Sequence, residues 1–268
     1  MTPLLTSGSP ARDEYTIFCD GVRSIAQVDL LQYKRGQMER RVRSFAERRG
    51  ATDLTTYLVD LRRTPGELDA FLDRVTINVS QLWRNPEQWR VLAKKVLPEL
   101  AGTGRVRAWS AGCSYGAEAY TLAATMRGAI PDARCEIRGT DIDKRMVARA
   151  RAGHFSVDDG RDAPRGELAR FFDVAEDGGW QAKRELLGMT RFEVGDLLRL
   201  RPQREAFDLV LCRNTVIYFN EEIRDALHAR LVEALRPGGY LVVGATERVA
   251  DAKGLGLASP HPFTYRKS

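Results

Sequence analysis

Short apolar segments alternate with helical patterns from residue 104 to the end of the chain, and this order limits the fold more than any other feature. Helical patterns follow the first, second and fourth segments, around residues 119–126, from 144 onward and at 221–235. Strands that alternate with helices form a parallel sheet joined by right-handed crossovers. The sequence therefore predicts an α/β fold here, with strands at 106–109, 136–140, 192–194, 207–212, 240–244 and 263–267.

The chain before residue 100 has a helical pattern instead. Apolar residues recur at spacings of three, four and seven, first at Leu31, Met38, Val42 and Phe45. Further helical patterns cover 54–61, 66–74 and 86–100. We expect three parts: a flexible leader at 1–14, a helical N-terminal domain at 15–100, and an α/β domain at 101–268 with a charged insertion near 155–190.

The net charge of +6 comes largely from one segment. Residues 34–49 carry seven basic and two acidic side chains, a net of +5. A solvated helix face is the usual explanation of such a run. The alternative is that Lys34, Arg41 and Arg48, which are seven residues apart and share one side of a helix, bind an acidic partner. Because the excess is local, we predict no nucleic-acid binding.

Several classes of protein are excluded by what the sequence lacks. The cysteines form no CxxC pair and the three histidines have no ligand spacing, so neither a disulfide framework nor a metal site is predicted. No apolar stretch has the length of a membrane helix. The first residues lack the basic start and apolar core of a signal peptide. We expect a cytoplasmic, monomeric protein that does not insert into the membrane.

The loop at 110–116, between the first strand and its helix, predicts a ligand site. Its small residues let a ligand approach the backbone, and the helix start offers N–H groups. The glycines are Gly112 and Gly116, so GxGxxG is missing and a dinucleotide is disfavoured. A ligand without phosphate, such as S-adenosylmethionine, needs only this looser loop. The alternative is a plain strand–helix turn.

Acidic residues near the strand ends extend this site. Asp141 ends the second strand and can accept both ribose hydroxyls, unless it caps the next helix, a role that Asp143 fills equally well. Glu118, in the first turn of the helix after the loop, can receive an ammonium group or simply favour the helix dipole. Asp196 follows the third strand, where it can face an adenine amino group or lie in solvent.

Two further segments combine polar and apolar residues at places that face a ligand. Arg213 and Asn214 end the fourth strand, and strand ends border the ligand crevice in open α/β sheets. Tyr218 and Phe219 follow and can wall the site or pack in the core. In the helical part, residues 76–84 place three polar side chains among apolar ones, which indicates a capping loop or a binding segment: Asn78, Ser80 and Arg84.

From Tyr33 onward these residues together resemble the chemotaxis receptor methyltransferase (CheR) family. The resemblance rests on five ordered motifs: 33–41, 76–84, 109–120, 140–143 and 212–219. The helix stop at Pro237-Gly238-Gly239 before an apolar strand is typical of class I methyltransferase domains. The chain departs from the family pattern in having Leu82-Trp83 for paired phenylalanines, Asp196 for asparagine, and Tyr115, Ala117 and Ala119 for Thr, Glu and Pro.

The resemblance implies a class I S-adenosylmethionine-dependent methyltransferase (Rossmann-like) domain with a small inserted β-subdomain, preceded by an all-α N-terminal domain. It implies methyl transfer to glutamate side chains on the cytoplasmic helices of membrane chemoreceptors, with S-adenosylhomocysteine as the product. We predict that the cofactor binds Gly112 and the residues at matching positions: Asn78, Ser80, Arg84, Glu118, Asp141, Asp196, Leu197, Arg213 and Asn214. We further predict that Arg84 and Tyr218 act at the methyl-transfer centre.

Other functions stay open at this point. One is a methyltransferase with another protein, an RNA or a small-molecule acceptor, because the α/β part alone does not define the acceptor. Another is a regulatory or scaffold protein that binds the cofactor with weak or no turnover, which the large side chain of Tyr115 and the loss of a glutamate at Ala117 favour. A nicotinamide dehydrogenase is disfavoured because GxGxxG is missing.

Overall fold

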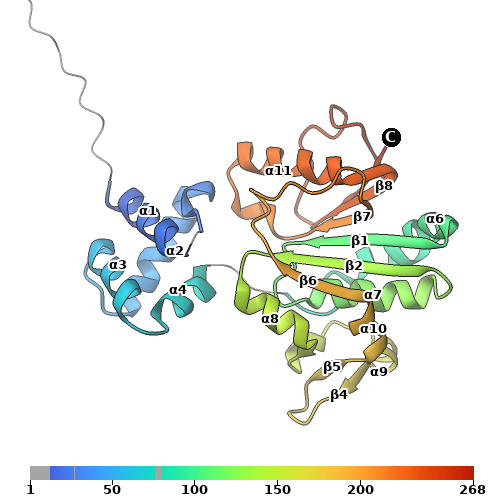
Figure 1. Cartoon of the computed structure of the whole chain (residues 1–268), viewed down its shortest axis with the longest axis horizontal. Helices are drawn as coiled ribbons and strands as arrows, with labels where there is room; N and C mark the ends of the chain where they lie inside the picture. The colour runs from blue at the N-terminus through green and yellow to red at the C-terminus, as the bar shows by residue number, and fades with distance from the viewer. Residues whose placement is uncertain (1–12, 27, 76–79) are drawn as a thin grey trace, which may run out of the picture. The chain divides into compact units, whose positions relative to one another are not determined.

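The computed structural model describes residues 13–26, 28–75 and 80–268. The chain divides into two compact units, Met1–Ile77 and Asn78–Ser268 (Figure 1). The predicted division after residue 100 differs from this one. The reason is that the helical stretch at 86–100 packs on α7 (Ala117–Ala129), and its apolar residues, Trp89 to Leu100, belong to the core of the second unit.

In the part of the first unit that the structure describes, four α-helices surround an aromatic core. Phe18 stacks on Tyr57 with ring centroids 6.1 Å apart, and Phe71 meets Phe18 edge-on at 5.7 Å. Leu31 was predicted to share the apolar face of one helix. It lies instead in a 3₁₀ turn before that helix and is 38% exposed, whereas its neighbour Leu30 is buried. The helices are α1 (Glu14–Ala26), α2 (Arg35–Arg48), α3 (Leu54–Arg63) and α4 (Glu67–Val75).

The second unit is built on a seven-stranded sheet in the order β6-β2-β1-β7-β8-β10-β9. The first five strands in this order are parallel, and β10 is antiparallel to both of its neighbours. Segment 207–212, which is apolar except for Asp208, is buried along its whole length, and its apolar run is why it was recognised as a strand. The strands are β1 (Arg105–Ala111), β2 (Arg134–Asp141), β6 (Thr190–Val194), β7 (Phe207–Cys212), β8 (Leu235–Val243), β9 (Leu257–His261) and β10 (Thr264–Lys267).

Two strands differ from their prediction. β8 begins at Leu235 rather than at 240, because Arg236 is held by an ion pair with the buried Asp208 on β7, and the register of β7 and β8 shifts there. β9 was not predicted at all. Most of its residues are exposed, so it lacks the apolar run by which the other strands were recognised.

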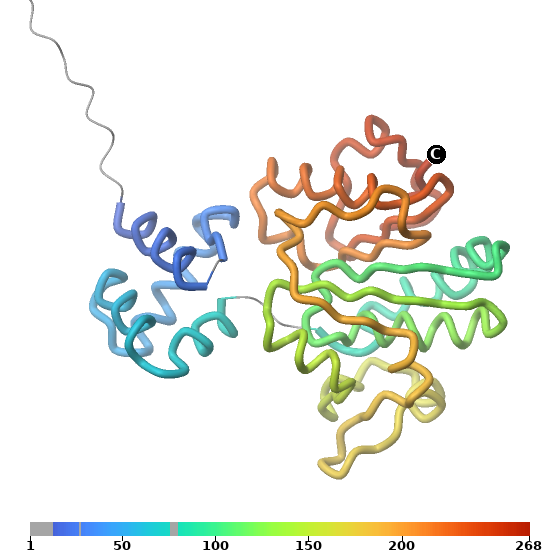
Figure 2. Tube along the Cα trace, in the orientation of Figure 1, coloured from blue at the N-terminus to red at the C-terminus, as the bar shows by residue number. Residues whose placement is uncertain are grey.

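Helices connect and cover the parallel strands, as Figure 1 and the trace in Figure 2 show. A π-helical turn at Leu92–Val96 joins two helices that were predicted as one. A hydrophobic core cluster of this unit includes residues of the sheet, of α7 and of these helices. The helices are α5 (Pro86–Val91), α6 (Leu97–Leu100), α7, α8 (Lys144–Ala152) and α11 (Glu221–Ala234).

A small β-subdomain lies between α8 and β6, at residues 154–189 (Figure 1). Its sheet has the order β3-β5-β4 and is antiparallel. Phe155 and Phe172 pack edge-on at 5.9 Å and belong to the core of the second unit, so the subdomain is continuous with it. Its elements are β3 (His154–Phe155), α9 (Arg165–Phe171), β4 (Phe172–Val174), β5 (Trp180–Ala182) and α10 (Arg184–Met189).

Within the described residues, every helix is too short or too polar to cross a lipid bilayer. The same part of the chain contains no group of three or more His, Cys, Asp or Glu side chains arranged to hold a metal ion.

Candidate active site

The loop from β1 to α7 turns sharply at the carboxyl end of the sheet. Gly112, Ser114 and Gly116 have φ values of +80°, +47° and +90°. A Cβ atom on Gly112 would lie 2.5 Å from the hydroxyl oxygen of Thr215, so only glycine fits there. The N–H groups of Gly112 and Cys113 donate to the Thr140 carbonyl at 2.8 and 3.1 Å. These bonds hold the loop against the end of β2.

Asp141, at the end of β2, is not the helix cap. Asp143 caps α8, because its carboxylate accepts the N–H groups of Arg145 at 2.9 Å and Met146 at 3.2 Å. Asp141 instead accepts the N–H of Ser114 at 2.7 Å and that of Asp143 at 2.9 Å. Burial raises the pKa of the Asp141 carboxyl. Its two oxygens keep lone pairs for further hydrogen-bond donors. Of the two aspartates that the sequence offered as the helix cap, Asp143 is the one that caps α8.

Glu118 is buried in the first turn of α7, between β1 and β7. Its carboxylate accepts the Ser110 hydroxyl at 2.7 Å and lies 3.4 Å from the Arg213 guanidinium. Burial raises the pKa of Glu118, and the charge of Arg213 opposes that shift. Glu118 is only 9% exposed, so it is not a solvent-exposed carboxylate whose position is explained by its interaction with the helix dipole alone. The side chain is part of a charged pair that is enclosed below the loop.

Arg213, at the end of β7, connects this pair to the α5 region. Its Nε donates to Gln88 at 2.9 Å, and its Nη2 donates to the Arg84 carbonyl at 2.7 Å and to Asn85 at 3.3 Å. The guanidinium also lies over the Trp89 ring, 5.0 Å from the centroid. These contacts give the side chain an organising role: it fixes residues 84–89 relative to the strand ends.

Asp196 and Leu197, beyond the end of β6, form a tight turn. The Asp196 carboxylate accepts the N–H of Leu198 at 2.8 Å and lies 3.3 Å from the Arg199 Nε. The Leu197 side chain is buried. Asp196 is therefore a structured turn residue rather than a solvated aspartate, and it lies one strand away from Asp141 at the same edge of the sheet.

Asn214 and Tyr218 lie in the loop after β7. Asn214 has a φ of +56°, a conformation that asparagine tolerates better than most residues. Tyr218 ends a 3₁₀ turn, Val216–Tyr218, and is half-buried, whereas Phe219 is buried. The alternatives left open by the sequence are thus divided: Phe219 packs in the core, and Tyr218 stays partly accessible.

The polar residues of the 76–84 segment are described only in part, because Asn78 lies outside the described residues. Leu82 and Trp83 are buried, and Ser80 and Arg84 are half-buried. The Trp83 N–H donates to the Thr121 hydroxyl on α7 at 3.0 Å. The segment is therefore attached to the helix that follows the glycine loop, close to Glu118 along that helix.

Both units match models of a single family. Residues 78–258 match "CheR methyltransferase, SAM binding domain", and residues 13–76 match "CheR methyltransferase, all-alpha domain". The chain belongs to the CheR methyltransferase family. Similar proteins include a chemotaxis protein methyltransferase of Listeria innocua, 32% identical over 95% of this chain and 97% of the relative. Chemotaxis protein methyltransferase 1 of Pseudomonas aeruginosa is 30% identical over 89% and 91%.

The match confirms the predicted fold class, the methyltransferase activity and S-adenosylmethionine as the methyl donor. The chemistry at the strand ends of this CheR methyltransferase fits that donor. Asp141 and Asp196 present carboxylates at the ends of adjacent strands, suited to hydroxyl and amino donors, and the loop at 112–116 places the Ser114 N–H against Asp141.

Glu247, which was not among the predicted site residues, organises the same edge of the CheR methyltransferase sheet. It is 3% exposed and lies just beyond the end of β8. An acidic residue beyond a strand end is the signal that identified Asp141 and Asp196, so the same criterion would have found it. Gln88, which binds Arg213, gave no such signal because it lies inside a helix.

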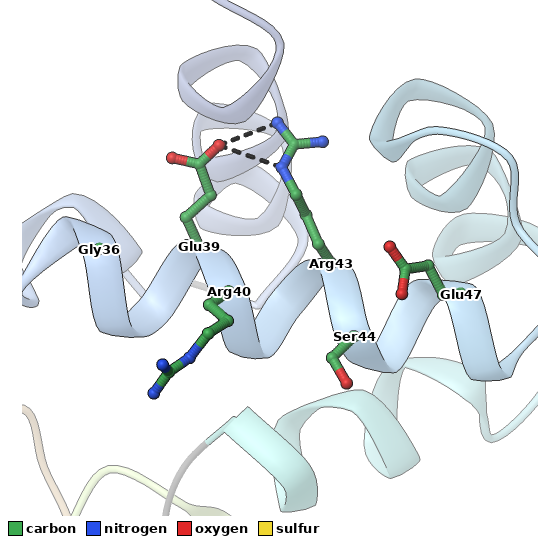
Figure 3. A pocket seen from close by; sticks show the side chains of 6 residues that line it. All are labelled: Gly36, Glu39, Arg40, Arg43, Ser44 and Glu47. Atoms are coloured by element: carbon green, nitrogen blue, oxygen red, sulfur yellow. Dashed lines mark hydrogen bonds and ion pairs between the residues drawn. The ribbon is translucent and has the colours of Figure 1, made fainter.

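The three basic residues of the predicted partner face of this CheR methyltransferase differ in exposure. Arg41 is half-buried and donates to the Val75 carbonyl at 3.0 Å, at the end of α4, whereas Lys34 and Arg48 are exposed. Beside them, a groove of about 440 Å³ runs along α2 (Figure 3). In it, Arg43 is paired with Glu39, and Arg40 points away from that pair. The lining residues are Gly36, Glu39, Arg40, Arg43, Ser44 and Glu47.

Proposed function

We propose that this CheR methyltransferase transfers a methyl group from S-adenosylmethionine to glutamate carboxylates on the cytoplasmic helices of chemoreceptors. One observation carries the proposal. The glycine loop, Asp141 and the buried Glu118–Arg213 pair converge at one sheet edge, in a chain whose first unit matches the all-α domain of the same family. Relatives along nearly the whole chain are named chemotaxis protein methyltransferases.

S-Adenosylmethionine supplies a methyl group that is already activated on a sulfonium; transfer to a carboxylate oxygen gives the ester and S-adenosylhomocysteine. The acceptor needs no general base, because a glutamate with a pKa of about 4.3 is an anion near neutral pH. The protein's task is therefore to align the reacting groups and to exclude water. A site of carboxylates, a buried arginine and backbone amides is sufficient for that task.

In this proposal the donor is held by the predicted residues. Asp141 accepts hydroxyl hydrogens, Glu118 faces the ammonium, and Asp196 with Leu197 receives the adenine. Arg213 acts through Glu118 and through the backbone at Arg84. Arg84 and Tyr218 border the transfer centre. The remaining contacts are assigned to Asn78, Ser80, Gly112 and Asn214.

Lys34, Arg41 and Arg48 on and before α2 are proposed to attract the acidic receptor helix. Exposed basic side chains raise the rate of encounter with an acidic partner and make it sensitive to salt. Since Arg41 also holds the end of α4, Lys34 and Arg48 supply most of this attraction. In this proposal the enzyme works in the cytoplasm as a monomer and binds no nucleic acid.

The direct test incubates the full-length protein with methyl-labelled S-adenosylmethionine and membranes that carry the chemoreceptors of its source organism. Base-labile label on a receptor band is the expected result, because methyl esters hydrolyse in base. An Asp141→Ala variant is the negative control for donor binding. Calorimetric binding of S-adenosylhomocysteine without label on any receptor would contradict the receptor substrate and favour another acceptor or a scaffold role.

A further inference from the structure

The hydroxyl group of Tyr115 joins three segments that are far apart in the sequence. It lies within hydrogen-bond distance of the Ser80 carbonyl oxygen and of Asp159 Oδ1, the latter at 2.7 Å. The residue itself belongs to the loop between β1 and α7, and its side chain is 5% exposed. A phenol has a single proton to donate, so the Ser80 carbonyl and the Asp159 carboxylate share the one proton of this hydroxyl.

Asp159 is a fixed acceptor rather than a mobile surface carboxylate. Its other oxygen accepts the N–H of Ser156 at 2.8 Å and the Ser156 hydroxyl at 2.9 Å. Its backbone carbonyl accepts the N–H of Leu82 at 2.9 Å. The side chain of Gln81 accepts from Arg161 at 2.9 Å. The start of the β-subdomain is therefore hydrogen-bonded along residues 80–82.

The direction of the hydroxyl is set by the packing of the ring. Phe155 of β3 lies 6.2 Å from the Tyr115 ring, centroid to centroid, and the Arg149 guanidinium lies 4.6 Å above the ring. Burial raises the pKa of the Tyr115 phenol, which keeps it a neutral donor at physiological pH. The large side chain that distinguishes this loop thus makes specific polar contacts.

We propose that Tyr115 is a positioning residue that couples the methyl-donor site to the β-subdomain. By sharing its proton between the Ser80 carbonyl and the Asp159 carboxylate, it holds the binding segment at 80–84 near both the glycine loop and the turn at Asp158–Gly160. Binding of the methyl donor then stabilises that turn. By linkage, a change in the turn alters the affinity for the methyl donor by the same factor. The inference rests on the proposed cofactor role of Ser80.

The test compares Tyr115→Phe with the wild-type protein, using S-adenosylhomocysteine as a probe that needs no receptor. Loss of this shared hydrogen bond predicts a roughly three- to ten-fold weaker Kd by calorimetry. In wild type, the probe is expected to slow hydrogen exchange of residues 156–162; in Tyr115→Phe this protection is lost. A purely structural role would lower the Tm and leave the protection intact.

Tyr240→Phe is the matched control. The Tyr240 hydroxyl also donates to a carboxylate, that of Glu99 at 2.6 Å, but neither residue belongs to the proposed site. The control variant should leave Kd and protection unchanged. Asp159→Ala is the second variant; with Tyr115→Phe it should give less than additive effects on Kd, since both remove one interaction. If Tyr115→Phe does not fold, Asp159→Ala alone decides.

Unchanged Kd and unchanged protection in either folded variant would overturn the proposal. Additive effects in the double variant would do the same. Failure of the wild-type protein to label receptors, with probe binding and its coupling intact, would contradict only the proposed receptor substrate. The two proposals are therefore separable by the same set of proteins.

Discussion

The Glu247 carboxylate accepts the backbone N–H of Asn214 at 2.8 Å in the interior of the second unit. The same carboxylate accepts the N–H groups of Gly244 at 2.6 Å and Val216 at 3.2 Å. One side chain therefore gives the loop after β7 its shape, including the left-handed conformation at Asn214. That loop also carries Tyr218, so the geometry of the proposed transfer centre depends on a residue that does not border it.

Glu247→Gln should destabilise the protein and weaken methyl transfer together. Glutamine keeps one oxygen and places its amide hydrogens against backbone N–H groups, which leaves buried donors unpaired at about 1–3 kcal/mol. Urea unfolding measures the loss of stability, and label transfer measures the activity. The exposed Glu222→Gln makes the same chemical change on α11 and should alter neither quantity. Equal behaviour of the two variants would show that Glu247 is dispensable.

Arg213→Met should be among the most damaging substitutions in the second unit. It removes the ion-pair partner of the buried Glu118 and leaves Gln88 and the Arg84 carbonyl without their donor. Breaking one side of a buried pair destabilises a protein by about 3–5 kcal/mol. Ser110→Ala, which removes only the 2.7 Å bond to Glu118, should lose about 1 kcal/mol. Chemical unfolding distinguishes the two; a milder effect of the arginine variant would contradict the buried-pair argument.

The adjacent residues Asp141 and Asp143 should separate binding from stability. Asp141→Asn is expected to weaken S-adenosylhomocysteine binding about ten-fold, because a carboxylate is the stronger acceptor for hydroxyl donors. Asp143→Ala should leave that affinity unchanged and lower stability by about 1 kcal/mol, the usual loss for an N-cap. Calorimetry and thermal unfolding of both variants check this. The reverse pattern would mean that the cofactor role belongs to Asp143.

The sequence predicted the sheet well because its central strands are largely apolar, as at 207–212, where Asp208 is the single charged residue. It did not predict which core the helix at 86–100 joins, since an amphipathic pattern shows that a face is buried and not what covers it. Likewise, Leu31 fitted a helical spacing that the 3₁₀ turn at Leu30–Gln32 interrupts.

The candidate site was predicted where one residue at a strand end is enough to suggest chemistry, as with Asp141. The sequence did not reveal what Glu247 and Tyr115 bind, because the partners that define their roles are distant along the chain. Glu247 accepts from Asn214 and Val216, 33 and 31 residues away, and Tyr115 lies 35 and 44 residues from Ser80 and Asp159. The direction of a side chain is set by such distant contacts. For Tyr115, the size of the side chain favoured weak or no turnover, whereas its hydroxyl contacts and ring packing give it a positioning role in the proposed site.

His228 on α11 should make stability depend on pH. Within the described part of the chain neither ring nitrogen has a hydrogen-bond partner, and burial lowers the pKa of His228 from 6.5 to about 4. The unfolded chain then binds the proton more readily, so stability is full above pH 6.5 and is lost as the pH falls towards 4. At pH 5 the loss should be roughly 2 kcal/mol relative to pH 7.5.

His228→Leu tests this, because it fills similar space without an ionisable ring. Urea unfolding at pH 7.5 and pH 5 should show a smaller difference for this variant than for wild type. His261→Gln, on the largely exposed strand β9, should keep the wild-type difference. A pH dependence that survives in His228→Leu would assign it to other groups.

Reversing the charge of Lys34 and Arg48 should weaken receptor methylation without changing the affinity for the cofactor. For Lys34→Glu/Arg48→Glu we expect the KM for receptor membranes to rise several-fold at low ionic strength, and the effect to shrink as salt screens the surface charges. Arg41 is left in place because it holds the Val75 carbonyl. The Kd for S-adenosylhomocysteine should stay the same, since these side chains belong to the first unit.

The matched control reverses the exposed Lys94 and Lys95, which lie in the second unit and change the net charge by the same amount. If only the α2 variant raises KM, the attraction is local to that surface, as steering by a specific patch requires. If both variants raise KM equally, the effect follows from net charge alone, and the receptor helix is recognised by another surface of the enzyme.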